Sequence, residues 1–126
     1  MKGIIKLANP ITVNNKELAE LQYNTDEITG ALFCEADSKR RFAAGAKNVS
    51  IAPAAEFDYG LHLYLGFAAV VATETGIDFA DLERVHGADL IGVMEVGRNF
   101  IMKSEESEQS NSDDASETTA EPTTQA

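Results

Sequence analysis

The sequence has one cysteine, no tryptophan and three prolines among its 126 residues. A single cysteine, Cys34, excludes an internal disulfide and any metal site that needs several cysteine ligands. Its neighbours Leu32 and Phe33 indicate a small side chain buried in a core rather than a reactive thiol. The sequence also lacks an apolar signal segment at its start, and its longest apolar stretch, Leu63–Ala72, is too short to span a bilayer. We therefore expect a cytoplasmic protein.

Positive charge is scarce: 10 lysine and arginine residues stand against 21 aspartates and glutamates, which gives a net charge of −11. Nucleic acids and anionic membranes are bound through Lys and Arg side chains, so neither is an expected partner. The one basic cluster, Lys39-Arg40-Arg41, lies in a predicted helix that also holds Glu35 and Asp37. We interpret it as a solvated face with pairs four residues apart, such as Glu35 with Lys39.

The first two dozen residues predict a β-hairpin. Two extended apolar runs flank Asn9-Pro10, where proline removes a backbone donor and disfavours helix, so short strands are expected. Asn14-Asn15 supplies residues that tolerate positive φ, as a two-residue hairpin turn requires. On the return strand, Lys16–Tyr23, the apolar residues do not keep period two. This predicts either a bulge near Ala19-Glu20 or an early end to the pairing.

The residues after the hairpin are predicted to form helices. Thr25 followed by two acidic residues indicates an N-cap, so a first helix is expected from about 26 to 46, with a loop over 45–55. The segment Ala54–Thr75 is apolar nearly all round, with Asp58, His62 and Thr73 on a narrow polar side. A body of about one hundred residues can hardly surround such a helix, so part of it is expected to face a second chain.

The C-terminal third predicts two more helices and a tail. Gly76 ends the apolar helix, Asp78 is placed to cap a short helix over Phe79–Val85, and a last helix is expected over Ala88–Met102. Residues 103–126 hold seven of the 21 acidic residues and almost no apolar side chains, which predicts disorder. The expected fold class is α+β and mainly helical. An N-terminal β-hairpin packs on a bundle of three to four helices over residues 1–102, and 103–126 form a disordered acidic tail.

No pattern of catalytic residues is present. His62 and His86 lie in unlike surroundings, and only Asp58 and Asp89 stand near them as further ligand-type residues, which is too few for a metal site. The glycines at positions 87, 92 and 97 do not form a phosphate-binding loop, and Cys34 lacks a nucleophile signature. We expect a protein that is not an enzyme and has no catalytic site, metal or cofactor.

Two helices carry more apolar surface than small neighbours would cover. Such a surplus indicates a protein that binds another protein. Alternatively, the same apolar helix faces pack against each other and against the hairpin within one chain. The sequence does not show which of these apolar side chains form the core and which bind a partner. The side chains that we assign to core and association surfaces together are Leu61, Tyr64, Leu65, Ala68, Leu90, Met94 and Phe100.

Two blocks of the sequence carry a family resemblance. Their matching residues are Ile5-Lys6-Leu7, Pro10-Ile11, Val13-Asn14, Lys16, Glu20-Leu21, Val70, Thr75-Gly76-Ile77, Asp81-Leu82, Ala88-Asp89-Leu90, Glu95-Val96 and Phe100-Ile101. The first block resembles the opening hairpin of the short tail assembly chaperones of long-tailed phages and phage tail-like particles, where the turn is more often Asn-Gly. The second is similar to that family's closing pattern of a helix ending in Thr-Gly, a short helical turn and a final helix.

The resemblance implies a non-enzymatic protein in the cytoplasm of the bacterial host. Such a chaperone binds and solubilises the long, coiled-coil-rich tape measure protein during tail assembly, with apolar helix faces covering apolar seams. The resemblance further implies that the chain forms a homo-oligomer and is absent from the mature particle. The tail tube protein is a further partner, because it displaces the chaperone.

Two other functions fit the composition. A structural tail or head-completion protein would share the small size and the hairpin, and would be found in purified particles. An acidic regulatory adaptor or nucleic-acid mimic would use the charge of −11 directly, and would lose its activity when residues 104–126 are removed.

Overall fold

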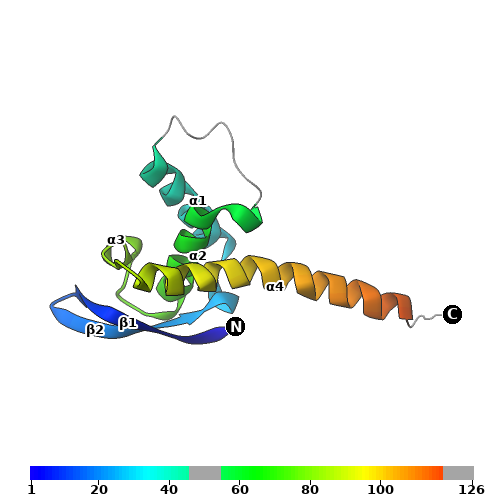
Figure 1. Ribbon diagram of the computed structural model, residues 1–126, viewed down its shortest axis with the longest axis horizontal. Helices are drawn as coiled ribbons and strands as arrows, with labels where there is room; N and C mark the ends of the chain where they lie inside the picture. The colour runs from blue at the N-terminus through cyan, green and yellow to red at the C-terminus, as the bar shows by residue number, and fades with distance from the viewer. Residues whose placement is uncertain (46–54, 118–126) are drawn as a thin grey trace.

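A computed structural model of the chain has an N-terminal two-stranded antiparallel hairpin followed by helices, which confirms the expected α+β, mainly helical class. It describes residues 1–45 and 55–117, with side chains at all of these positions except 44, 56 and 104–117. The elements are β1 (Lys2–Val13), β2 (Lys16–Asn24), η1 (Thr25–Glu27), α1 (Gly30–Ala44), η3 (Ala55–Phe57), α2 (Tyr59–Thr73), α3 (Phe79–Leu82) and α4 (Asp89–Glu117). The hairpin and α1 lie on opposite sides of the molecule, with α2 between them (Figure 1).

The hairpin turns at Asn14 and Asn15, whose φ angles of 53° and 64° confirm the predicted positive-φ turn. The register pairs Lys6 with Glu20 and Ile11 with Leu18. Four residues of β1 therefore oppose the single residue at position 19, which places the predicted irregularity where it was expected. The prediction of short strands broken at the proline was wrong, because the extra residues form a bulge inside β1 and the strand continues through it.

The bulge in β1 is held by the first residue of α4. The two carboxylate oxygens of Asp89 accept hydrogen bonds from the backbone N–H groups of Ala8 and Asn9, each at 2.9 Å. These N–H groups have left the strand ladder, so the carboxylate supplies the acceptors that the bulge removed. The N–H groups of Ala8 and then Asn9 lower the pKa of Asp89 below its ordinary value. One carboxylate thereby ties the hairpin to the start of α4.

Replacing Asp89 by asparagine is expected to lower the melting temperature at neutral pH, because an amide has one acceptor oxygen and cannot accept both N–H groups. The lowered pKa of Asp89 means that its carboxylate stabilises the fold above the pKa of an unfolded aspartate, about 3.9, and that this contribution is lost as the pH falls through the folded value. Melting curves of wild type and Asp89→Asn should therefore converge in acid. A difference that is the same at neutral and acid pH would contradict the two-oxygen contact.

The first long helix begins later than expected. Thr29, and not Thr25, caps α1, with its hydroxyl oxygen accepting from the backbone N–H of Leu32 at 3.1 Å. Thr25 instead closes the open end of the hairpin, where its backbone N–H donates to the carbonyl oxygen of Met1 at 2.8 Å. The start predicted near residue 26 was wrong because this contact holds the segment in the short turn η1. The loop predicted over 45–55 falls largely on 46–54, outside the described residues.

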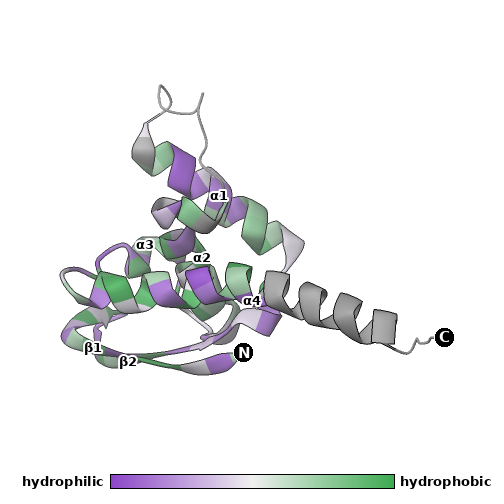
Figure 2. Ribbon diagram, turned by 45° about the vertical axis from the view of Figure 1, so that its right-hand side comes forward, coloured by the Kyte–Doolittle hydropathy of each residue, from purple (hydrophilic) through white to green (hydrophobic). Residues whose placement is uncertain are grey.

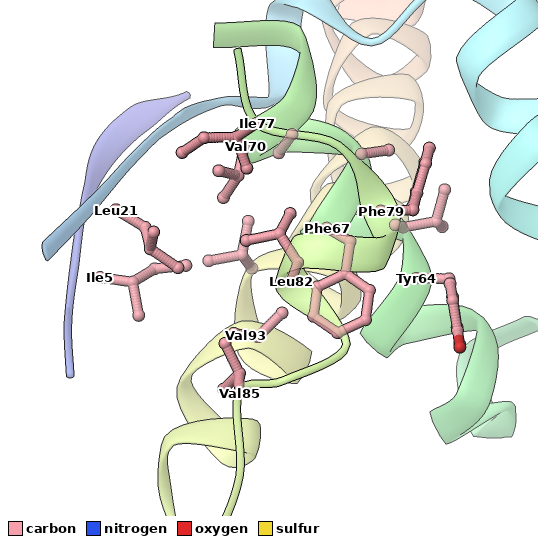
Figure 3. Close-up of a cluster of buried hydrophobic side chains, with 14 of the residues drawn as sticks. Ile5, Leu21, Tyr64, Phe67, Val70, Ile77, Phe79, Leu82, Val85 and Val93 are labelled. Carbon is pink, nitrogen blue, oxygen red and sulfur yellow. The ribbon is translucent and has the colours of Figure 1, made fainter. Parts of the chain in front are cut away.

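The core is built around α2, which packs between the hairpin, α1 and α4. Figure 2 shows hydrophilic and hydrophobic residues mixed along α1. Side chains from β1, β2, α3 and α4 converge on α2 in Figure 3. The surrounding elements bury most apolar side chains of α2, while Leu63 and Val71 stay partly exposed, so the expectation that part of this helix faces a second chain stays a prediction. The buried apolar side chains are Ile5, Leu7, Ile11, Val13, Leu21, Ala36, Leu61, Tyr64, Leu65, Phe67, Ala68, Ala69, Val70, Ile77, Phe79, Leu82, Val85, Val93 and Val96.

Two glycines allow α2 and α4 to pack closely. A Cβ atom placed on Gly97 of α4 would overlap the carbonyl oxygen of His62, and one placed on Gly66 of α2 would overlap the carbonyl oxygen of Val93. At both points, the backbone of one helix lies against the backbone of the other. A side chain at either glycine would have to push the helices apart, so the two glycines determine how closely α4 packs against α2.

The connection from α2 to α4 follows the prediction in outline. Asp78 caps α3, and the side chain of Asp81 accepts in return from the backbone N–H of Asp78, which forms a capping box. Gly76 has φ of 90° two residues beyond the C-cap, so α2 ends at Thr73 rather than 75. The short helix is likewise shorter than expected and ends at Leu82.

The last helix is longer than predicted. The expected end at Met102 was wrong, since α4 continues to Glu117. No proline or glycine occurs between Gly97 and Pro122, so nothing in this stretch removes a helical hydrogen bond or adds backbone freedom, and glutamate and glutamine propagate a helix well. Of the tail predicted to be disordered over 103–126, residues 103–117 belong to α4, and residues 118–126 lie outside the described residues. None of the described helices is long and apolar enough to cross a bilayer.

Candidate protein-binding groove

An open groove of about 620 Å³ lies between the C-terminal half of α1, the middle of α2 and the start of α4. Each of the three helices contributes a wall, and the segment between α3 and α4 completes the rim. Most of the lining is apolar, as expected of a surface that accepts an apolar partner. The side chains that line it are Lys39, Phe42, Ala43, Leu63, Tyr64, Phe67, Glu83, Val85 and Leu90.

The polar groups of the groove stand at its edges. The hydroxyl of Tyr64 donates to the carboxylate of Glu83 at 2.9 Å. Burial, this hydrogen bond and the negative charge of Glu83 raise the pKa of Tyr64 to about 12, so the phenol stays protonated. The ammonium of Lys39 lies 5.7 Å from the centre of the Phe79 ring in α3. The lining thus holds one positive and one negative side chain among mostly apolar ones.

Phe42 is the most exposed large hydrophobic residue of the described chain, with 89% of its surface accessible. It stands on the last turn of α1, beside the groove that it helps to line. An exposed phenylalanine next to an apolar hollow is a type of surface that a partner protein can bind. Phe42 is therefore a candidate contact residue.

Ion pairs anchor α1, and with it Phe42, against α2. Arg40 Nη2 lies 2.7 Å from Asp37 Oδ1, and Arg40 Nη1 lies 3.5 Å from Asp58 Oδ2. Asp58 is buried and caps α2 by accepting from the backbone N–H of Leu61 at 3.0 Å. The interpretation of the basic cluster as a solvated face was therefore wrong for Arg40, because its side chain reaches across to the start of α2. The i, i+4 pair formed in this region is Asp37 with Arg41, at 2.7 Å.

The structure separates the seven side chains that the sequence left undivided. Four of them, Leu61, Tyr64, Leu65 and Ala68, are buried in the core. Of these, only Tyr64 also lines the groove. The other three lie on α4 and are partly buried: Leu90 lines the groove, Met94 lies one turn further along, and Phe100 packs its ring 6.5 Å from that of Phe33. Leu61, Leu65 and Ala68 offer no surface to a partner while the chain is folded.

Several residues of the groove were missed from the sequence. Phe42 and Leu63 are apolar residues of two predicted helices, and helical spacing alone does not distinguish a core residue from one that lines a groove. Lys39 was assigned to a solvated face, while Glu83 and Val85 lie where a short helix was expected to continue. The groove arises where α1 stops covering α2, and the sequence pattern of a single helix contains no signal for that.

The possible reactive residues do not assemble into a chemical site. His62 was expected on a polar side of α2 but is fully buried beneath η3, where its Nε2 donates to the carbonyl oxygen of Ala55 at 2.7 Å. Cys34 was expected to be buried but is exposed on α1. His86 is exposed, and its Nδ1 lies 3.1 Å from the carbonyl oxygen of Arg84. Among the residues whose side chains are described, His, Cys, Asp and Glu form no group of three that could hold a metal ion.

The groove is therefore the feature of the described chain best suited to recognition. Its lining is mostly apolar and includes an exposed aromatic side chain. These are properties of a surface that receives a protein segment. A scan of family models, a search of curated proteins and a search of solved structures found no match to this chain.

Proposed function

We propose that the protein is a non-enzymatic chaperone of phage tail or tail-like particle assembly, and that its groove binds apolar helical segments of the tape measure protein. The observation that carries the proposal is an open apolar groove of about 620 Å³ with a fully exposed phenylalanine at its rim. An assembly chaperone needs such a surface, because its client exposes apolar seams until it is packed into the particle.

The order of the elements also supports the proposal. The resemblance implies a hairpin at the start and, at the end, a helix closed by Thr-Gly, a short helical turn and a final helix. The chain has β1 and β2 at its start, and α2 is followed by Thr75-Gly76, α3 and α4. The two blocks of resemblance thus coincide with the elements that frame the core, while α1, which carries Phe42, lies between them.

The groove suits a helix better than an extended strand. Its walls are helices, and its lining holds Leu63 and Phe67 of α2 together with the charged residues Lys39 and Glu83. An amphipathic helix that lays its apolar face into such a groove buries residues spaced three and four apart, and its own charged residues then meet the rims. The seams of a coiled-coil-rich client provide apolar residues at this spacing.

The proposal includes the cellular setting that the resemblance implies. The chain acts in the cytoplasm of the bacterial host, associates with further copies of itself, and is displaced by the tail tube protein before the particle matures. The acidic stretch after residue 103 keeps the complex of chaperone and apolar client in solution, since added carboxylates favour solubility.

Co-expression of the full chain with the tape measure protein of the same genome tests the proposal. The client should become soluble and should co-purify with the wild-type chain. Leu90→Asp should abolish both effects, because Leu90 lines the groove, while Ile91→Asp on the neighbouring exposed position should leave them intact. Circular dichroism of both variants checks that each is folded, and Leu90→Gln serves if Leu90→Asp is not.

Two outcomes would contradict the proposal. A tape measure protein that stays equally insoluble with and without the wild-type chain would remove the chaperone function. Recovery of the chain from purified particles in stoichiometric amounts would favour a structural tail or head-completion protein instead.

A further inference from the structure

We infer that the two turns of α1 after Ala36, which we call the groove turns, open and close as a unit, and that Arg40 is the positioning residue that holds them closed. The groove turns contribute Lys39, Phe42 and Ala43 to the lining of the groove. The inference rests on the proposed function in one respect only, that the closed turns present Phe42 to the client. The opening itself is argued from how α1 is attached to the core.

Few apolar side chains hold α1 on the core. Among its described side chains Ala36 alone is buried, whereas nine residues of α2 are buried. Leu32 packs against the core, and the ring of Phe33 lies 6.5 Å from a phenylalanine ring of α4. These contacts all belong to the first two turns of the helix. In the groove turns Phe42 and Ala43 are exposed, so hydrophobic burial contributes little to holding that part of α1 in place.

Charged side chains join the groove turns to other elements. The ammonium of Lys39 lies 5.7 Å from the centre of the Phe79 ring in α3. Arg40 spans two helices, because its Nη2 lies 2.7 Å from Asp37 Oδ1 within α1 and its Nη1 lies 3.5 Å from Asp58 Oδ2 at the start of α2. Asp58 is buried and also caps α2, so it offers Arg40 a fixed point of attachment. The groove turns are therefore held mainly by ionic contacts.

The guanidinium of Arg40 is only partly satisfied in the closed state. Its Nε is buried and has no hydrogen-bond partner in the described part of the chain. Its stem lies over Gly60, where an added Cβ would come within 3.3 Å of Cγ and 3.5 Å of Cδ. Burying a charged group whose donors are incompletely paired costs free energy, and opening returns that group to water. Release of the groove turns therefore costs less than unfolding of the core.

Opening changes the groove without changing the elements that form the core. The open state keeps the sides of the groove formed by α2 and α4 and loses the side that carries Phe42. A client that contacts Phe42 binds the closed state better, so client binding and closure favour each other. Arg40 does not line the groove, so it acts on a client only by positioning the residues that do.

Hydrogen exchange of the full chain without a client, resolved for each amide by NMR, tests the inference. In wild type, the amides of residues 40–44 should share one opening constant, at least about tenfold larger than that of the buried part of α2. Fraying from the helix end would instead give a graded series along these residues. Arg40→Met keeps most of the stem and removes the charge, so it should raise the shared constant at least about tenfold.

Arg41→Met is the matched control. Arg41 Nη2 lies 2.7 Å from Oδ2 of the same Asp37, and this pair lies within α1. Its loss should change the opening constant by no more than about twofold, the effect of one ion pair along a helix. If Arg40→Met does not fold, Arg40→Lys serves instead. One ammonium cannot hold both aspartates, so a rise of at least about threefold is expected.

Asp58→Asn tests whether Arg40 acts through α2. Asparagine keeps the oxygen that accepts from Leu61 and loses the charge that faces Arg40. If the two side chains act as a pair, the double variant with Arg40→Met opens no more often than Arg40→Met alone. Effects that multiply in the double variant would overturn the inference, as would a graded series over 40–44 or an equal effect of Arg41→Met.

The same amides separate this inference from the proposed function. With the tape measure protein bound, they should exchange more slowly than in the free chain. A free chain that opens as described but leaves the tape measure protein insoluble would overturn the chaperone function and leave the opening. A chain that solubilises the tape measure protein, with exchange over 40–44 that does not respond to Arg40→Met, would overturn the opening and leave the chaperone function.

Discussion

Replacing Gly97 by alanine is expected to lower the free energy of unfolding by about 3 kcal/mol, the upper part of the range for an overpacked core. The new Cβ would overlap the carbonyl oxygen of His62, and it would lie 2.7 Å from the carbonyl carbon and 3.0 Å from the backbone nitrogen of Gly66. All three are backbone atoms of α2. They cannot rotate away as a side chain would, so α2 and α4 must separate and the surrounding core must loosen.

Gly92 provides a control in the same helix. A Cβ there would meet only Ile5 Cγ2, at an ordinary van der Waals distance of 3.7 Å. Gly92→Ala should therefore stabilise the protein by up to about 1 kcal/mol, the difference in helix propensity between glycine and alanine. Urea denaturation followed by circular dichroism measures both variants. If Gly97→Ala is as stable as Gly92→Ala, the two helices do not touch as described.

The close contact at Gly97 shows what local sequence patterns can and cannot provide. Gly97 lies on the apolar face of the last predicted helix, so its burial was predictable. That it faces the backbone of His62 depends on how α4 crosses α2, and no periodicity specifies a crossing. The predicted polar side at His62 failed for the same reason, since α4 and η3 cover a position that a helical wheel leaves open.

Signals that act over a few residues were reliable. The turn at Asn14 and Asn15, the capping of α3 by Asp78 and the irregularity opposite position 19 depend on local backbone chemistry, and all three are present. Thr25 is the exception. Its residue type and the acids after it matched a helix start, but a contact with Met1 uses its backbone N–H, and such a pairing is invisible until the hairpin is closed.

The exposure of individual side chains and their contacts with other helices were predicted less well than the type of each secondary-structure element. Cys34, Arg40 and Phe42 all lie on α1, which covers only one side of α2. Their burial or exposure depends on where α1 ends and on its orientation relative to α2. The polarity pattern of this fifteen-residue helix specifies neither. The groove exists because of this incomplete cover, so the candidate site is the part of the molecule that the sequence predicted least well.

Replacing Leu65 by alanine is expected to lower the free energy of unfolding by about 2–5 kcal/mol, as for other fully buried leucines. Leu65 has no exposed surface and lies at the centre of α2, where the hairpin, α1 and α4 surround it. The loss has two parts: the burial of three carbon atoms, Cγ, Cδ1 and Cδ2, is lost from the core, and rigid neighbours leave a cavity in their place. The core of so small a domain has little stability in reserve, so partial unfolding near body temperature is the expected readout in a thermal melt.

Ile91→Ala is the matched comparison, because it shortens a branched aliphatic side chain that is 56% exposed on α4, and it should change the free energy of unfolding by no more than about 0.5 kcal/mol. The pair of variants decides between the two roles that an all-round apolar helix allows. If Leu65 formed a partner surface, Leu65→Ala would weaken association and leave the stability of the single chain unchanged. If Leu65→Ala instead lowers stability independently of protein concentration, and the groove variants affect only association, the apolar side chains of α2 serve the core of one subunit. Recognition would then depend on Phe42 and the groove beside it.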